Sequence, residues 1–120
     1  MIAPYRLPSE RTDADWAAIW AARQEKIRLR DAALAYRREN ILRLLHGDDL
    51  PPPPPGVAPD YRRWARDLCR DLDRLRDGSD WVQAAHRRYP ARLAYWRALR
   101  DATGHQRIRL RRIAAGRCQP

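Results

Sequence analysis

The sequence lacks the features by which secreted modules, metal sites and membrane proteins are first recognised. Its two cysteines, Cys69 and Cys118, have the spacing of neither a zinc site nor a redox motif, which argues against a disulfide-stapled module. No apolar run reaches the roughly 18 residues of a membrane span. Residues 1–16 also lack the apolar segment of a signal peptide. We therefore expect a cytoplasmic protein that does not associate with membranes.

Motifs for catalysis are missing as well. The chain has no glycine-rich phosphate loop and no nucleophile motif. His46, His86 and His105 lie in different segments, and none has a carboxylate or cysteine at a spacing that suits acid–base chemistry. The acidic residues lie almost entirely in arginine–aspartate mixtures or at helix caps. We therefore expect no enzyme, no cofactor and no metal ion.

Phenylalanine is absent and lysine occurs once, whereas the chain holds 24 arginines and five tryptophans. The abundance of arginine, alanine, proline and aspartate together is typical of a GC-rich genome, so codon usage accounts for the ratio of arginine to lysine. Hydrophobic residues make up 44% of the 120, which excludes a disordered composition. Five tryptophans suit a small core with a few large anchors.

The placement of the charge carries more information than its amount. The formal net charge is +10, and residues 79–120 hold ten basic against two acidic side chains. Residues 79–120 thus carry a net charge of +8, and residues 1–78 carry the remaining +2. A basic excess confined to one part of a chain is how a surface for a polyanion shows in sequence.

Residues 1–47 read as a short arm followed by one long helix. Thr12 or Asp13 suits its N-cap, and Gly47 suits the position after its end. Such a helix of roughly 34 residues would be about 51 Å long, whereas a compact chain of this size has a radius of gyration of about 14 Å. The helix must therefore bend, project or pair with a second copy.

A seam of apolar residues recurs every seven positions along this helix. Its members are Trp20, Ile27, Leu34 and Ile41. A coiled coil needs a second apolar position in each seven-residue repeat, and arginines at 23, 30 and 37 occupy that position here. An ordinary two-stranded coiled coil is therefore not expected. We expect these four residues to form a homo-oligomer contact.

A break follows at residues 48–58, where Pro51 to Pro55 exclude a helix and favour polyproline II. Such a segment is either a ligand for an aromatic groove or a stiff spacer, and we favour the spacer. Residues 59–120 form the basic helical region, with helices expected at 59–77, 79–89, 90–103 and 105–115; the last could also be a strand. The expected fold is all-α: a long N-terminal helix, a proline-rich break and a bundle of three to four short helices.

Apolar residues at three- and four-residue spacing give each short helix one buried face. In the first they are Tyr61, Trp64, Ala65, Leu68, Leu72 and Leu75, and its arginines and aspartates are expected on a solvated face. In the next two they are Trp81, Val82, Ala85, Tyr89, Leu93, Trp96 and Leu99. The tight break at Tyr89–Pro90 fits a helix-turn-helix, although an ordinary helical hairpin fits equally well.

Three short motifs lie within residues 77–101. They are Asp77-Gly78-Ser79, Pro90-Ala91-Arg92 and Trp96-Arg97-Ala98-Leu99. In this order they resemble the helix-turn-helix of some phage small terminase subunits. The resemblance covers about a fifth of the chain and implies DNA binding linked to packaging, with a ring oligomer as the assembly.

The resulting hypothesis is a non-enzymatic protein that binds nucleic acid, in particular DNA. The expected contacts are Arg87, Arg88, Arg92, Arg97, Arg100, Arg107, Arg109, Arg111 and Arg112. The alternative is a small interaction module, such as an inhibitor or adaptor, that binds an acidic protein through arginine and tryptophan. Exposure of Trp16 and Trp20 would favour this alternative.

Overall fold

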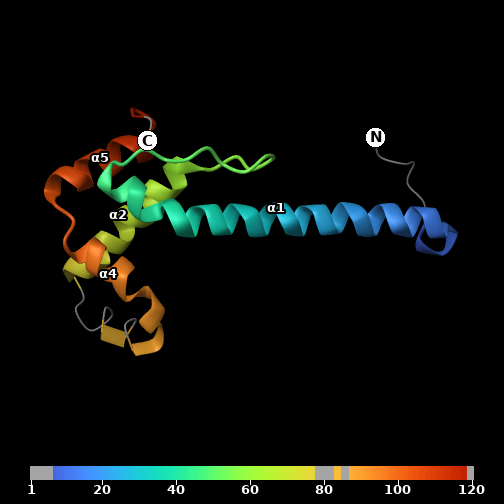
Figure 1. The fold of residues 1–120 in the computed structure, drawn as a ribbon, viewed down its shortest axis with the longest axis horizontal. Coiled ribbons are helices and arrows are strands. Elements are labelled where there is room, and N and C mark those ends of the chain that lie inside the picture. Colours follow the sequence, from blue (N-terminus) through green and yellow to red (C-terminus); the bar gives the residue numbers. More distant parts are fainter. Residues whose placement is uncertain (1–6, 78–82, 85–86, 119–120) are drawn as a thin grey trace.

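The structure is a computed structural model that describes residues 7–77, 83–84 and 87–118. These residues form an all-α fold (Figure 1). In chain order its elements are η1 (Pro8–Glu10), α1 (Asp13–His46), α2 (Tyr61–Asp77), η2 (Pro90–Arg92), α4 (Leu93–Arg100) and α5 (Gly104–Ala114). Of the expected apolar side of the 79–89 helix, Trp81, Val82 and Ala85 lie outside the described residues. The fourth member, Tyr89, was expected on the buried face but is 48% exposed.

Helix α1 begins and ends where the sequence predicts. The hydroxyl of Thr12 accepts a hydrogen bond from the backbone N–H of Asp15 at 3.2 Å, and the Asp15 carboxylate accepts one from the N–H of Thr12 at 2.9 Å. At the other end Gly47 adopts a φ of 79°, which costs glycine little and other residues much. These two caps define a single helix of 34 residues.

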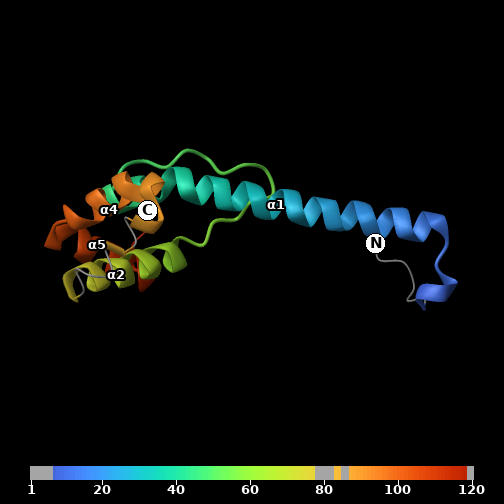
Figure 2. The same cartoon turned by 90° about the horizontal axis from the view of Figure 1, so that it is seen from below.

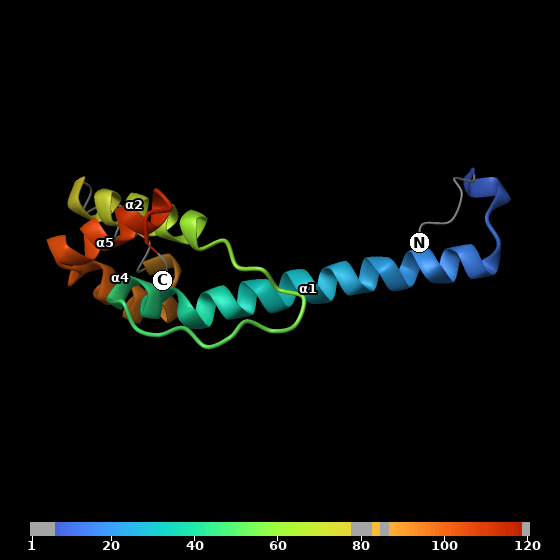
Figure 3. The same cartoon turned by 90° about the horizontal axis from the view of Figure 1, so that it is seen from above.

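The molecule is elongated because only the C-terminal end of α1 joins the bundle, while its N-terminal half projects away from it (Figures 1 and 3). The radius of gyration is 19.8 Å, and the principal extents are 59 × 35 × 21 Å. A compact chain of this length would have a radius of about 14 Å. Within the single chain the long helix therefore projects from the bundle.

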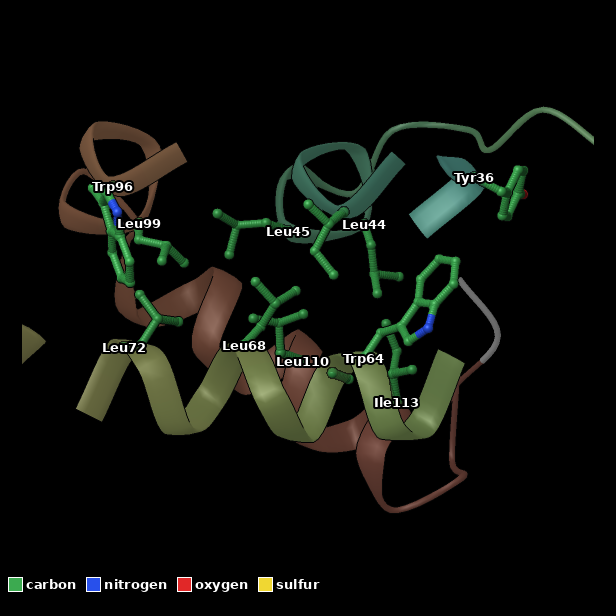
Figure 4. Close-up of a cluster of buried hydrophobic side chains, with 12 residues drawn as sticks. Tyr36, Leu44, Leu45, Trp64, Leu68, Leu72, Trp96, Leu99, Leu110 and Ile113 are labelled. Carbon is green, nitrogen blue, oxygen red and sulfur yellow. The ribbon is translucent and has the colours of Figure 1, made fainter. Parts of the chain in front are cut away.

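The hydrophobic core lies between α2 and the elements around it (Figure 4). Leu44 and Leu45 point from α1 toward α2, and Leu72 lies near Trp96 and Leu99 of α4. The fully buried large side chains are Leu44, Leu45, Leu68, Leu72, Leu99, Leu110 and Ile113. The predicted helical periodicity of residues 59–77 is confirmed, because Trp64, Ala65, Leu68 and Leu72 are buried.

Residues 48–60, which we call the strap, run back along α1 before they return to α2 (Figure 2). The hydroxyl of Tyr36 donates a hydrogen bond to the carbonyl of Pro51 at 2.6 Å. At Gly56, whose φ is 80°, an added Cβ would lie 2.9 Å from Cδ2 of Leu29. The proline-rich segment thus packs on the same chain, on one side of α1.

The aspartates of α2 connect helices, which corrects the expectation of a purely solvated face. Asp67 accepts a hydrogen bond from Arg37 of α1 at 2.7 Å, and Asp71 accepts one from the hydroxyl of Tyr95 of α4 at 2.9 Å. Sequence periodicity places these carboxylates beside the apolar stripe but does not reveal which helices approach them.

The seven-residue seam of α1 is divided between two environments. Ile41 is 9% exposed and belongs to the chain's own core, so it is not part of a surface for a second copy. Trp20, Ile27 and Leu34 are 61%, 39% and 58% exposed, because the bundle covers only the C-terminal end of α1. Trp16 is 47% exposed.

Candidate nucleic-acid interface

An open groove lies where the C-terminal half of α2 meets η2 and α4. Its lining residues are Asp71, Arg74, Ala84, Arg87, Arg88, Tyr89, Arg92 and Trp96. Its volume of about 730 Å³ is within the range of pockets that hold small organic ligands. The groove is thus large enough for a nucleotide-sized group.

The break before α4 places the groove's aromatic and cationic groups together. Tyr89, with φ −134° and ψ 69°, has a non-helical backbone, and proline disfavours the helical region for the residue before it. Pro90 then opens η2, and the N–H of Arg92 bonds the carbonyl of Tyr89 at 2.9 Å. The Cζ atom of Arg92 lies 5.2 Å from the centre of the exposed Tyr89 ring.

The charge of the groove is strongly positive. Among its described lining residues, four are arginines and one, Asp71, is a carboxylate, which accepts the hydrogen bond from Tyr95. Burial, together with the nearby Asp71 carboxylate, raises the pKa of Tyr95 well above its usual value, so this hydroxyl remains a donor even in alkaline solution. Because the four guanidinium groups outnumber the carboxylate among these described residues, the groove attracts anions.

The outer face of α4 adds two of the predicted arginines. Trp96 and Leu99 face the core, whereas Arg97 and Arg100 of this eight-residue helix are exposed. The Nε atom of Arg100 lies 3.7 Å from the Asp101 carboxylate. Because both side chains are exposed, this contact contributes little and a phosphate can replace it.

Helix α5 is docked against the end of α1. Thr103 and Gln106 form a capping box at its start, in which each side chain bonds the other residue's backbone N–H. The Gln106 amide nitrogen also lies 2.9 Å from Nδ1 of His46, and because an amide nitrogen only donates, Nδ1 is the acceptor. This contact joins the start of α5 to the C-terminal end of α1.

Two of the arginines predicted on α5 serve the fold instead. Arg109 donates a hydrogen bond to the carbonyl of Leu44 at 2.5 Å, and this carbonyl at the end of α1 also accepts one from the Gly47 N–H. Arg107 is half-buried, and its Nε atom is buried without a hydrogen-bond partner among the described residues. Neither side chain is presented to a nucleic acid in the way the sequence suggested.

The other two α5 arginines are on the surface. Arg111 lies 3.8 Å from the Asp73 carboxylate of α2 in a solvent-exposed pair, and Arg112 is exposed. Ile108 is also outside, with half of its surface exposed, although its apolar character suggested an inner position. The predicted contacts on α5 are thus reduced to Arg111 and Arg112.

Sequence reasoning missed Arg74, which lies on α2 but lines the groove with the arginines of the later segments. The alternation of arginine and aspartate in α2 concealed it. Arg74 could have been included because it lies in the last turn of α2, close in sequence to the basic residues that follow.

None of the helices within the described ranges is both long enough and apolar enough to cross a bilayer. The chain matches no protein-family model, and comparisons with curated proteins and with solved structures likewise find no match.

Proposed function

We propose that this chain binds nucleic acid, with duplex DNA as the preferred form, through the groove and the outer face of α4. The observation that carries the proposal is the convergence of Arg74, Arg87, Arg88 and Arg92 around one groove, beside Tyr89. Arginine suits this role because its planar guanidinium makes paired hydrogen bonds to phosphates and to guanine.

The exposed arginines divide naturally between two kinds of contact. Those of the groove can hold phosphates, which position a protein on a duplex without reading its sequence. Arg97 and Arg100 lie on a helix that would face the bases if the hairpin acts as a helix-turn-helix. A role in DNA packaging, which the terminase resemblance implies, stays within this proposal.

The test compares two variants that lose the same charge from different places. Arg87, Arg88 and Arg92 are replaced by alanine in one variant, and Arg28, Arg38 and Arg63, which are exposed and away from the groove, in the other. Binding to a labelled duplex is followed by fluorescence anisotropy across a salt series. We expect the groove variant to lower the slope of log K against log salt by about 3, or about 1 per lost phosphate contact.

Equal losses in the two variants would show that only net charge matters and would contradict the assigned surface. The same series with single-stranded DNA and RNA of equal length tests the preference for duplex. Binding that vanishes at physiological salt for all three would remove the proposal altogether.

A second candidate function is recognition of an acidic protein. It is favoured by the exposure of Trp16 and Trp20, because tryptophan and arginine dominate the energetics of protein interfaces. In that case Trp20→Ala would abolish binding of one defined protein from nuclease-treated extract, while Arg97→Ala would leave that binding unchanged.

A further inference from the structure

The projecting half of α1 carries an apolar face that nothing in the described chain covers. Trp16, Trp20, Ile27 and Leu34, which we call the α1 stripe, follow four- and seven-residue steps and so lie within an arc of about 40°. All four are at least 39% exposed. Isolated apolar residues are common on surfaces, but a continuous row of this size marks a contact site.

The α1 stripe is the continuation of the chain's own core. One further seven-residue step leads from Leu34 to Ile41, and Leu45 follows on the same face; both are buried by the bundle. The strap does not cover the exposed part, because it reaches Leu29 and Tyr36 on the other side of the helix. A single apolar face thus runs along α1, covered at one end and bare at the other.

We propose that the α1 stripe packs against the α1 stripe of a second copy of this chain, with the two helices antiparallel. The charges on the stripe select this direction. In a parallel pair Arg23 and Arg30 would each face the same residue of the partner subunit, and the two basic bundles would lie side by side. Opposed like charges destabilise such pairings, and the antiparallel arrangement avoids both conflicts.

The spacing of the residues also fixes the register. Trp16 faces Leu34 of the partner subunit, Trp20 faces Arg30 of the partner subunit, and Arg23 faces Ile27 of the partner subunit. Each arginine then lies against an aromatic or aliphatic side chain. Arg30 over Trp20 would form a cation–π contact. The described part of the chain already contains arginine–tryptophan contacts of this kind, with Arg11 at 5.0 Å from the Trp16 ring centre and Arg37 at 5.9 Å from that of Trp64.

In this register the paired residues all belong to the part of α1 that the bundle does not cover. The paired residues run from Trp16 to Leu34, and the chain's own core begins two residues later at Tyr36. The dimer would therefore be a rod with a basic bundle at each end. The proposal does not depend on nucleic-acid binding, because the association is measured without nucleic acid.

The first test is the mass in solution, measured by sedimentation equilibrium over a range of concentrations. We expect the wild-type chain to be a dimer and Ile27→Glu to be a monomer of half that mass. Ala18→Glu adds the same charge nine residues away, on the opposite face of α1, and should remain a dimer. Far-UV circular dichroism of each variant checks that the helices persist.

The second test is directional and uses a Cys69→Ala, Cys118→Ser background. Arg23→Cys and Ile27→Cys chains are prepared separately and then mixed under mild oxidation. We expect a disulfide between the two different chains, and little linkage within either chain alone. Strong linkage of Ile27→Cys to itself would overturn the antiparallel register. A wild-type chain that is monomeric at every concentration would overturn the proposal. The α1 stripe would then be interpreted as a binding site for an acidic protein.

Discussion

Replacing Ile41 by alanine should destabilise the chain far more than the same replacement at Ile27, although both residues occupy the same position of the seven-residue pattern in α1. Ile41 is 9% exposed within the core, whereas Ile27 is 39% exposed on the projecting half. A buried isoleucine truncated to alanine costs about 2–5 kcal/mol in transfer and cavity free energy. At Ile27 we expect a change within about 0.5 kcal/mol, because the lost contacts are few and alanine favours the helix.

The assays are urea unfolding and thermal unfolding, both followed by circular dichroism, at protein concentrations low enough to keep the chain monomeric. For a chain of this length, 1 kcal/mol corresponds to a shift of about 4 °C in Tm, so Ile41→Ala should lower Tm by about 8–20 °C. Raising the concentration should reveal a cost at Ile27 as well, since pairing stabilises the helix by mass action. Equal losses at the lowest concentration would refute the reasoning, because they would mean that the projecting half of α1 is packed within one chain.

Three further predictions concern the caps, the strap and the response to alkali. Thr103→Ala removes the capping box of α5 and should lower the free energy of unfolding by about 1 kcal/mol in urea titrations, with exposed Ala115→Ser as a neutral control. Gly56→Ala forces a side chain into a left-handed conformation against Leu29 and should cost more than about 1 kcal/mol; no change would mean that the strap does not rest on α1. Burial, aided by the hydrogen bond with Tyr61, raises the pKa of Tyr36 to about 12. Its contribution is therefore complete below the unfolded value near pH 10 and is lost as pH rises through 12, so Tyr36→Phe should lessen the fall in stability over that window.

The boundaries of α1 could be read from the sequence because local chemistry sets them. Thr12 offers a capping hydroxyl and Gly47 a left-handed conformation, and neither depends on the rest of the fold. The break at Pro51 to Pro55 is also set by local chemistry, because proline itself ends the helix. The path that the strap takes after the break is not set locally. That the strap returns along α1 depends on Tyr36 and Leu29, far from it in sequence.

The candidate interface was predicted less completely, for a related reason. Arg97 is exposed because its neighbours Trp96 and Leu99 are buried, which periodicity reveals. Arg92 is exposed although it lies four residues before Trp96, because it belongs to η2 and precedes α4. Arg107 lies three residues before Leu110 and so falls on the inner face of α5, a fact the same periodicity could have shown. The role of Arg109 could not be foreseen, because it depends on where the end of α1 meets α5.

A helix supported at one end only should not exchange its amide protons uniformly. Near Leu44 and Leu45 the amides of α1 are protected by the whole bundle, whereas around Trp20 each turn is held by its own hydrogen bonds alone. Within one continuous helix, exchange should therefore become faster from His46 toward Asp13 as local opening replaces global unfolding. Slower exchange toward Asp13 at high concentration would show that a second chain supports the projecting half.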